Sequence, residues 1–312
     1  MDQNQDLDNI DYTYKHLFKA KWIITALCIC FLVLVSVIPI GDKFDAVIQK
    51  AITSSGCPIK YSNYEFKFFA PRIELSNLLI PKRCTNLSQD INLEKTALYL
   101  QGPSFSPLGF AMRLKTQYGT SPIDTKLIVG FSSITVHIEN DPKDQQNWNV
   151  INLADIGKLQ KNFKVAGHIH LSNVYTQLTY AGQIANLKLN VASKDFKIPG
   201  QNIQIFKIGT IDIGNMLLQA ELKNGSSLEL KQFTLGKDGS AIIANFKGSS
   251  KLKMRRIKES TLKVRGELAL SPKFQEKYAW TNILLGKFDK KDNYYQIEVS
   301  GKLGSPKFTS AR

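Results

Sequence analysis

Leu127-Ile-Val-Gly-Phe-Ser-Ser-Ile-Thr-Val-His-Ile138 is the stretch that decides the fold class of this chain. Its apolar side chains recur at every second position, first at Leu127, Val129 and Phe131 and then at Ile134, Val136 and Ile138. In a β-strand, successive side chains point to opposite faces, so a period of two indicates a strand with one apolar face. The stretch therefore predicts two neighbouring half-buried strands.

The same period continues along most of the chain after Tyr61. It recurs in segments 163–171, 187–191, 203–205, 228–230, 262–270 and 297–299. Turn-forming residues separate these segments every 8 to 12 residues, among them Pro199-Gly200, Asn224-Gly225, Lys237-Asp238-Gly239 and Lys291-Asp292-Asn293. Short strands joined by such turns are typical of antiparallel sheets. We therefore expect a mainly β domain of 14 to 16 strands.

Three short helices are expected beside these strands. The first is amphipathic and runs from Phe44 to Ile52, after Asp42 as its cap. The second lies at 151–160, and the third begins after Ser271 and Pro272 and ends near Leu285. Three helices cannot cover one face of so many strands. The long curved antiparallel sheet must therefore either close on itself as a sandwich or leave a groove-like apolar face.

An uncharged run from Trp22 to Ile40 precedes the β domain. As a helix with a rise of about 1.5 Å per residue, its 19 residues match the ~30 Å hydrocarbon thickness of a bilayer. The anchor residues include Trp22, Ile23, Leu27, Phe31, Leu34 and Ile38. A secretory signal peptide is the rival interpretation, but its apolar core is usually about 7 to 15 residues and ends at a small-residue cleavage site. The run predicts a single uncleaved transmembrane helix.

Lys15, Lys19 and Lys21 lie next to the N-terminal end of this run. Because Lys and Arg near a span favour the cytoplasmic side, residues 1–21 are expected in the cytoplasm, 22–40 in the membrane and 41–312 outside it, as a periplasmic or other extracytoplasmic domain. The formal net charge of the chain is +15, and residues 1–21 contribute −1, so the remainder carries +16. Such a charge favours anionic partners such as lipid headgroups, lipopolysaccharide, peptidoglycan or nucleic acid, unless it is only a solvated lysine-rich face.

One stretch of the exported part is especially basic. It contains Lys251, Lys253, Arg255, Arg256, Lys258, Lys263 and Arg265, with Glu259 as its one acidic residue. Anionic headgroups or an acidic protein are the expected partners of this patch, because the periplasm argues against nucleic acid. The alternative is a solvated edge strand whose lysines prevent aggregation.

The four cysteines divide between the two parts of the chain. Cys28 and Cys30 lie in the predicted span and are expected to be apolar lipid-facing residues. Cys57 and Cys84 lie in the exported part, where an oxidising compartment would let them form a disulfide. Two buried free thiols are the alternative.

No catalytic constellation is recognisable. The chain lacks a phosphate-binding loop, a nucleophile elbow and a zinc-type cysteine or histidine spacing. His168-Ile169-His170 would place two imidazoles on the same side of a strand, but no third ligand is identifiable. The sequence therefore predicts a protein without enzymatic activity, cofactor or metal.

Several segments resemble the AsmA-like superfamily of inner-membrane-anchored periplasmic proteins, and most of all the type II secretion system protein N (GspN) family. The N-terminal part of the resemblance comprises the amphipathic helix up to Gly56, the segment from Tyr64 to Ile80, Pro103-Ser104-Phe105-Ser106-Pro107-Leu108 and Asn147-Trp148-Asn149. The part most similar to GspN comprises Leu270, Pro272, Phe274, Tyr278, Asn293-Tyr294-Tyr295, Gly301, Leu303, Pro306 and Phe308.

The resemblance implies a non-enzymatic role in the cell envelope. One hypothesis is a component of the type II secretion system that supports protein export and contacts other secretion components. The other is a lipid-binding or lipid-transfer protein whose apolar groove holds phospholipid. The resemblance transfers no catalytic residue, and membrane lipid is an expected partner under either hypothesis.

Overall fold

The computed structural model describes residues 49, 57–67, 71–85, 89–139, 149–157, 164–180, 183–203 and 206–311. The chain divides into two compact units, Met1–Gly56 and Cys57–Arg312. The predicted transmembrane segment 22–40, its anchor residues and most of the predicted helix 44–52 lie outside the described residues. Within the described ranges, no helix is both long and apolar enough to cross a bilayer.

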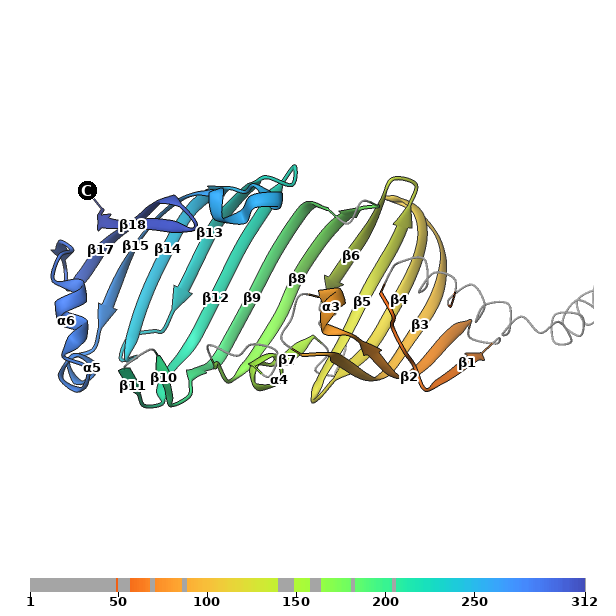
Figure 1. Cartoon of the computed structure of the whole chain (residues 1–312), viewed down its shortest axis with the longest axis horizontal. Coiled ribbons are helices and arrows are strands. Elements are labelled where there is room, and N and C mark those ends of the chain that lie inside the picture. The colour runs from red at the N-terminus through yellow and green to blue at the C-terminus, as the bar shows by residue number, and fades with distance from the viewer. Residues whose placement is uncertain are drawn as a thin grey trace, which may run out of the picture. The chain divides into compact units, whose positions relative to one another are not determined.

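The second unit is built on one long open antiparallel sheet of 16 strands (Figure 1). Its N-terminal strands are β1 (Asn63–Lys67), β2 (Arg72–Ile80), β3 (Ile91–Phe105), β4 (Leu108–Tyr118), β5 (Ser121–Gly130), β6 (Ser133–Glu139), β7 (Val150–Asn152) and β8 (His168–Thr179). Its C-terminal strands are β9 (Ile184–Ile198), β12 (Ile211–Lys223), β13 (Ser227–Leu235), β14 (Ile242–Lys251), β15 (Thr261–Leu270), β16 (Lys290–Lys291), β17 (Tyr294–Lys302) and β18 (Ser305–Ser310). A separate small hairpin pairs β10 (Gln201–Ile203) with β11 (Phe206–Ile208).

The strand order nearly follows the sequence. The neighbours along the sheet are β1-β2-β3-β4-β5-β6-β8-β9-β12-β13-β14-β15-β17-β16, while β7 pairs with β8 and β18 pairs with β17. The mainly β antiparallel sheet expected from the sequence is thus confirmed. Of the two expected arrangements, the sheet takes the open one and does not close on itself.

Two of the predicted turns show why the strands reverse where they do. Asn224 and Gly225 have φ values of 51° and 62° and connect β12 to β13. Asp292 and Asn293, with φ values of 48° and 67°, connect β16 to β17. Two consecutive residues with positive φ make the tight turn whose twist matches an antiparallel hairpin, and Gly, Asn and Asp tolerate it best.

The strand expected over 163–171 begins later than predicted. β8 starts at His168 and runs on to Thr179. Gly167 interrupts the pattern with a φ of 110°, and a Cβ at this position would lie 2.4 Å from the carbonyl oxygen of Asp195. Close approach of the neighbouring backbone therefore requires glycine here, and the ladder forms only beyond it.

The described helices are short: α3 (Lys82–Thr85), α4 (Leu153–Gly157), the 3₁₀-helix η1 (Met254–Glu259), α5 (Pro272–Lys277) and α6 (Trp280–Leu285). The prediction of a helix from residue 151 is wrong at its start, since Val150–Asn152 pair with β8 as β7. Asn149 holds this segment in place, because its side-chain Oδ1 accepts a hydrogen bond from the Asp124 backbone N–H at 2.8 Å.

The single helix expected from Pro272 to Leu285 is in fact two. Ser271 caps α5 as predicted, and its hydroxyl accepts a hydrogen bond from the Phe274 N–H at 3.3 Å. Tyr278 then leaves the helical conformation, with φ −125° and ψ 61°. Its buried hydroxyl accepts a hydrogen bond from the Gly209 N–H at 2.9 Å. This contact with a distant segment accounts for the break, which local sequence does not reveal.

The best-buried core lies where α5 covers the sheet. Ile208, Ile211, Ile213 and Tyr278 form a cluster there, with Ile213 only 1% exposed. A second cluster of Phe288, Tyr295 and Ile297 packs against partly buried side chains such as Leu285. We call the first cluster the covered corner. These contacts cover one end of the apolar face.

Candidate functional site

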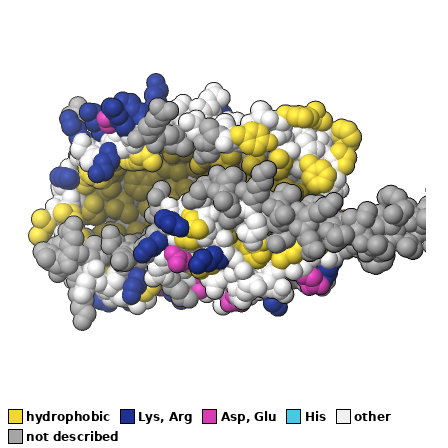
Figure 2. Space-filling view, turned by 45° about the vertical axis from the view of Figure 1, so that its right-hand side comes forward, with side chains coloured by type: hydrophobic (Ala, Val, Ile, Leu, Met, Phe, Trp, Pro, Cys, Tyr) yellow, Lys and Arg dark blue, Asp and Glu magenta, His cyan; other side chains and the backbone are white. Residues whose placement is uncertain are grey.

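The hollow side of the sheet is lined by hydrophobic side chains (Figure 2). The strand registers show how continuous this lining is. One row crosses seven neighbouring strands, β8, β9, β12, β13, β14, β15 and β17, through Val174, Leu189, Ala220, Leu230, Gly248, Val264 and Val299. We call these seven residues the apolar row. None of them carries a polar side chain, and each is of intermediate exposure.

A second row runs parallel to the apolar row. It consists of Val191, Leu218, Phe233, Phe246, Gly266 and Ile297. Strands lie about 4.8 Å apart, so the six spacings of the apolar row extend over ~29 Å. That is about twice the ~15 Å depth of one bilayer leaflet, taken as half of the hydrocarbon core. The hollow face therefore offers a continuous apolar surface long enough for extended hydrocarbon chains.

The outer face of the same strands has the opposite character. The row next to the apolar row contains His137, Tyr175, Lys188, Glu221, Glu229, Ser249, Lys263 and Ser300. Each of these residues directly precedes or follows an apolar residue of the hollow face in the sequence. The alternation of period two thus separates a polar outer surface from an apolar inner surface.

Many charges on the outer face are paired with one another. One carboxylate oxygen of Glu221 lies 2.5 Å from the Lys231 ammonium, and the other lies 3.7 Å from the Lys223 ammonium. The hydrogen bond from Lys231 lowers the pKa of the Glu221 carboxyl, and the same bond raises the pKa of Lys231. Arg113 binds both carboxylate oxygens of Asp124, at 2.8 and 2.7 Å. Glu221 and Asp124 are largely buried, and these pairs neutralise their carboxylates without an external ligand.

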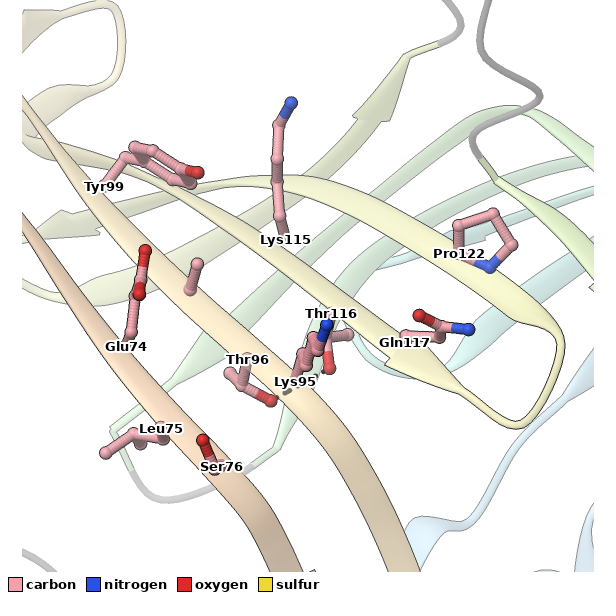
Figure 3. A pocket seen from close by; sticks show the side chains of 11 residues that line it. Glu74, Leu75, Ser76, Lys95, Thr96, Tyr99, Lys115, Thr116, Gln117 and Pro122 are labelled. Atoms are coloured by element: carbon pink, nitrogen blue, oxygen red, sulfur yellow. Dashed lines mark hydrogen bonds between the residues drawn. The ribbon is translucent and has the colours of Figure 1, made fainter. Parts of the chain in front are cut away.

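A cavity of about 490 Å³ lies on this sheet over β2 to β5 (Figure 3). Glu74, Tyr99, Lys115 and Pro122 line it, one from each strand. Glu74 is already held by the Lys67 ammonium at 2.9 Å and the Arg72 guanidinium at 2.6 Å. The Lys67 hydrogen bond lowers the pKa of Glu74. The Glu74 carboxylate is thus already paired with two cations that do not line the cavity.

The predicted histidine pair lies at the beginning of β8. His168 is exposed, and its Nδ1 lies 2.7 Å from Asp195 Oδ2, while its backbone N–H donates to Asp195 Oδ1 at 2.8 Å. Burial raises the pKa of Asp195, but hydrogen bonds from the His168 backbone and ring and from Ser193 outweigh it, so the pKa lies below its ordinary value. His170 is half-buried on the same strand. Among the described residues, no three His, Cys, Asp or Glu side chains gather as metal ligands.

Cys57 and Cys84 form a disulfide, with their Cα atoms 5.6 Å apart. The bond joins the segment before β1 to the short helix α3 after β2. It therefore ties the first residues of the second unit to the first hairpin of the sheet. Closing a loop of this length restricts the unfolded chain, which is worth about 3 to 4 kcal/mol in the chain-entropy description.

The predicted basic patch is only partly a single surface. Lys253 and Arg256 both bind the Glu259 carboxylate, each at 3.3 Å, and Arg265 binds Glu298 at 2.5 Å on the outer face. In the part of the chain that the structure describes, Lys251, Lys258 and Lys263 are exposed and form no ion pair. The side chain of Arg255 lies outside the described set. The turn around η1 therefore keeps a net positive charge, while Arg265 is neutralised away from it.

A group of exposed aromatic residues has no counterpart among the predicted site residues. Phe105 and Phe131 are 85% and 87% exposed, and Leu108, Phe110 and Tyr180 are also exposed. They lie at the turns that connect β3 to β4, β5 to β6 and β8 to β9. The sequence signal that marks them is an absence of charge, since segments 96–112, 127–138 and 165–187 contain no Asp, Glu, Lys or Arg.

Comparisons with protein-family models, with curated proteins and with solved structures give no match to this chain. The resemblance to AsmA-like proteins and to GspN therefore stays a prediction that rests on the residues quoted above.

Proposed function

We propose that the hollow apolar face binds the acyl chains of membrane lipids, and that the protein is a lipid-binding or lipid-transfer protein without enzymatic activity. The observation that carries this proposal is the apolar row, which crosses seven strands without a polar side chain. Its residues are partly exposed, although an apolar surface of this extent is unfavourable in water. A hydrocarbon ligand is the partner that such a surface fits best.

Burial of a lipid's methylene groups on this surface would supply the free energy of binding. Removing one methylene group from water contributes about 0.8 kcal/mol, so ten methylenes on this surface would contribute ~8 kcal/mol before the cost of ordering the ligand. The outer face has no comparable continuous apolar row, because Lys188, Glu221 and Glu229 interrupt it. Lipid is therefore expected on the hollow face alone.

The test is a pair of double variants that introduce glutamine on opposite faces of the same strands. The first variant, Leu189→Gln with Leu230→Gln, places two amides in the apolar row. The control variant, Lys188→Gln with Glu229→Gln, changes the preceding residue on each strand, which lies on the outer face. The control pair keeps the net charge unchanged. Phospholipid that co-purifies with each full-length protein is measured by native mass spectrometry.

The hollow-face variant should lose bound phospholipid at least fivefold, and the outer-face variant should change less than twofold. Wild-type protein without any co-purified phospholipid, or equal losses in both variants, would contradict the proposal. Because glutamine in the hollow face could also disturb folding, Ala220→Phe provides a second variant that fills the same surface without adding a polar group. It too should reduce bound lipid.

We also propose, from the uncharged run Trp22–Ile40, that one transmembrane helix holds the chain in the inner membrane with residues 1–21 in the cytoplasm. A lipid-binding surface requires access to a membrane, so the two proposals are compatible. Reporter enzymes fused at the C-terminus test the orientation. Activity of a reporter that works only in the periplasm is the expected result, and activity of a cytoplasmic reporter would refute it.

A second candidate function follows from the C-terminal strands. The segment that resembles GspN contains β18, an end strand on which Phe308 is exposed. Exposed end strands can pair with a strand of another protein, which would suit a component of the type II secretion system. A photo-crosslinking amino acid at Phe308 in intact cells should then capture another secretion component. Recovery of none would count against this function and leave the lipid proposal untouched.

A further inference from the structure

One long edge of the sheet gathers the hairpin turns that follow β3, β5, β8, β12, β14 and β17 (Figure 1). This follows from the antiparallel order, because alternate turns of such a sheet lie on the same edge. We call it the hairpin edge. It forms a rim of the hollow apolar face, and its chemistry changes from one half to the other.

The N-terminal half of the hairpin edge is apolar. Its turns carry the exposed side chains of Phe105, Leu108, Phe110, Phe131 and Tyr180. The turns are also in contact. The Tyr180 hydroxyl donates a hydrogen bond to the Gly130 carbonyl oxygen. Phe105 and Phe131 both line one cavity of about 360 Å³ between the β3–β4 and β5–β6 hairpins. Five exposed large apolar residues on three neighbouring turns form a patch, not a scatter of single side chains.

Near the turns that carry this patch, the strands contain no charged residues. Segments 96–112, 127–138 and 165–187 together make 52 residues without Asp, Glu, Lys or Arg. At the 21% charged residues of the whole chain, about eleven would be expected. Aromatic side chains are favoured at the membrane–water interface, and uncharged strand ends beside them avoid the cost of carrying a charge toward the hydrocarbon core.

The C-terminal half of the hairpin edge is basic. Segments 223–226, 251–260 and 302–305 contain Lys223, Lys251, Lys253, Arg255, Arg256, Lys258 and Lys302, with Glu259 as the one acidic residue. Backbone hydrogen bonds join two of these turns, since Leu303 N–H donates to Ser260 and Gly304 N–H donates to Lys258, at 2.8 and 2.9 Å. Ile257 and Leu303 are exposed among the lysines. Figure 2 shows Lys and Arg gathered at one end of the upper rim and hydrophobic side chains at the other.

We propose that the hairpin edge docks on the surface of an anionic lipid bilayer, with the aromatic tips inserted among the headgroups and the basic turns on anionic phosphates. A bilayer matches both halves, because it offers a negative surface over an apolar interior. A second copy of this chain does not, since the edge has almost no acidic residues to complement its own basic half. The docking does not depend on lipid in the hollow face, but it would place that face beside the membrane.

The test measures how close each edge lies to lipid in the full-length protein. A tryptophan is introduced by Phe131→Trp on the hairpin edge or by Lys237→Trp in the β13–β14 turn on the opposite edge. Each protein is reconstituted in vesicles of phosphatidylcholine with about one third phosphatidylglycerol, and lipids with brominated acyl chains quench nearby tryptophan. The wild-type signal is subtracted to remove the contribution of the native tryptophans.

Quenching of the tryptophan introduced at 131 should exceed that at 237 at least twofold. Equal quenching at both positions would overturn the proposal and leave an acidic protein as the partner of the basic turns. A second comparison tests the charged half within the Phe131→Trp protein. Lys251→Gln, Lys258→Gln and Lys302→Gln together should weaken quenching, whereas Lys194→Gln, Lys237→Gln and Lys273→Gln should leave it unchanged. Equal effects of both triple changes would refute the role of the basic turns.

The lipid-binding proposal is separable from this one. If bound phospholipid is found on the hollow face but the introduced tryptophan at 131 is not quenched, the groove is retained and docking fails. If quenching occurs without any co-purified phospholipid, the docking is retained and the groove proposal fails.

Discussion

The covered corner and the apolar row belong to the same apolar face, yet the chain treats them differently. In the covered corner, α5 and the segment before β12 bury Ile208, Ile211 and Ile213. Along the apolar row, residues such as Leu189 and Leu230 stay partly exposed. This chain buries its apolar surface where a helix covers it. The apolar row is therefore open because no helix lies over it in the part of the chain that the structure describes, and not because its strands differ in character.

The largest effect is expected from truncation in the covered corner. Ile213→Ala should lower the free energy of unfolding by about 3 kcal/mol, because it leaves a cavity among side chains that cannot collapse fully. Urea denaturation of the full-length protein in detergent measures the change. Asp212→Ala is the neighbouring control, whose exposed ion pair with Lys197 at 3.5 Å should contribute below about 0.5 kcal/mol. Similar losses in both would contradict a packed corner.

Removing one hydroxyl should loosen the same corner to a smaller extent. Tyr278→Phe leaves the Gly209 N–H without its acceptor, so the free energy of unfolding should fall by about 1 to 2 kcal/mol. Tyr294→Phe is the control, because its hydroxyl has no hydrogen bond in the part of the chain that the structure describes. The two variants are compared by thermal unfolding. An unchanged midpoint for Tyr278→Phe would mean that the break between α5 and α6 has another cause.

Truncation in the apolar row should cost less than truncation in the corner. Leu230→Ala is expected to lower the free energy of unfolding by about 1 kcal/mol in lipid-free protein, since the side chain is only partly buried there. Added phospholipid should raise the stability of the wild type more than that of the variant. The same denaturation experiment with and without lipid measures both effects. If Leu230→Ala lowered the free energy of unfolding of the lipid-free protein as much as Ile213→Ala does, the row would have to be covered.

The smallest effect is expected on the outer face, from pH. The hydrogen bond from Lys231 lowers the pKa of Glu221 in the folded protein below its ordinary value of 4.5. The pair therefore stabilises the fold above about pH 4.5, and this contribution is lost as the pH falls through the folded pKa. Unfolding midpoints between pH 7 and pH 3 should show a shallower decline for Glu221→Gln than for the wild type. Parallel curves would rule out a contribution from the pair.

The alternation of apolar residues made the sheet predictable. Period two at 127–138 predicted strands that the structure contains as β5 and β6, and the Asn224-Gly225 turn was recognisable because few other residue pairs adopt its backbone conformation. The failures involve contacts between distant segments. The break at Tyr278 depends on Gly209, and the start of β8 depends on the backbone of Asp195. Local patterns contain no information on such neighbours.

The candidate site was predictable only in outline. A shortage of helices predicted an uncovered apolar face, but not which of its parts α5 would cover. The basic stretch was recognisable as a patch, yet the neutralisation of Arg265 by Glu298 required the register of β15 against β17. The aromatic tips were missed because their signal is the absence of charged residues near the turns of three separate hairpins. Only the strand order brings those hairpins to one edge.

The sequential strand order has a consequence for how this architecture can change in length. Because strands of the main sheet pair mostly with their neighbours in the chain, inserting one hairpin between two others would leave the remaining pairings intact. Each added hairpin would extend the hollow face by ~10 Å, the spacing of two strands. The number of hairpins therefore sets the length of the hollow face, and with it the distance that this face can span.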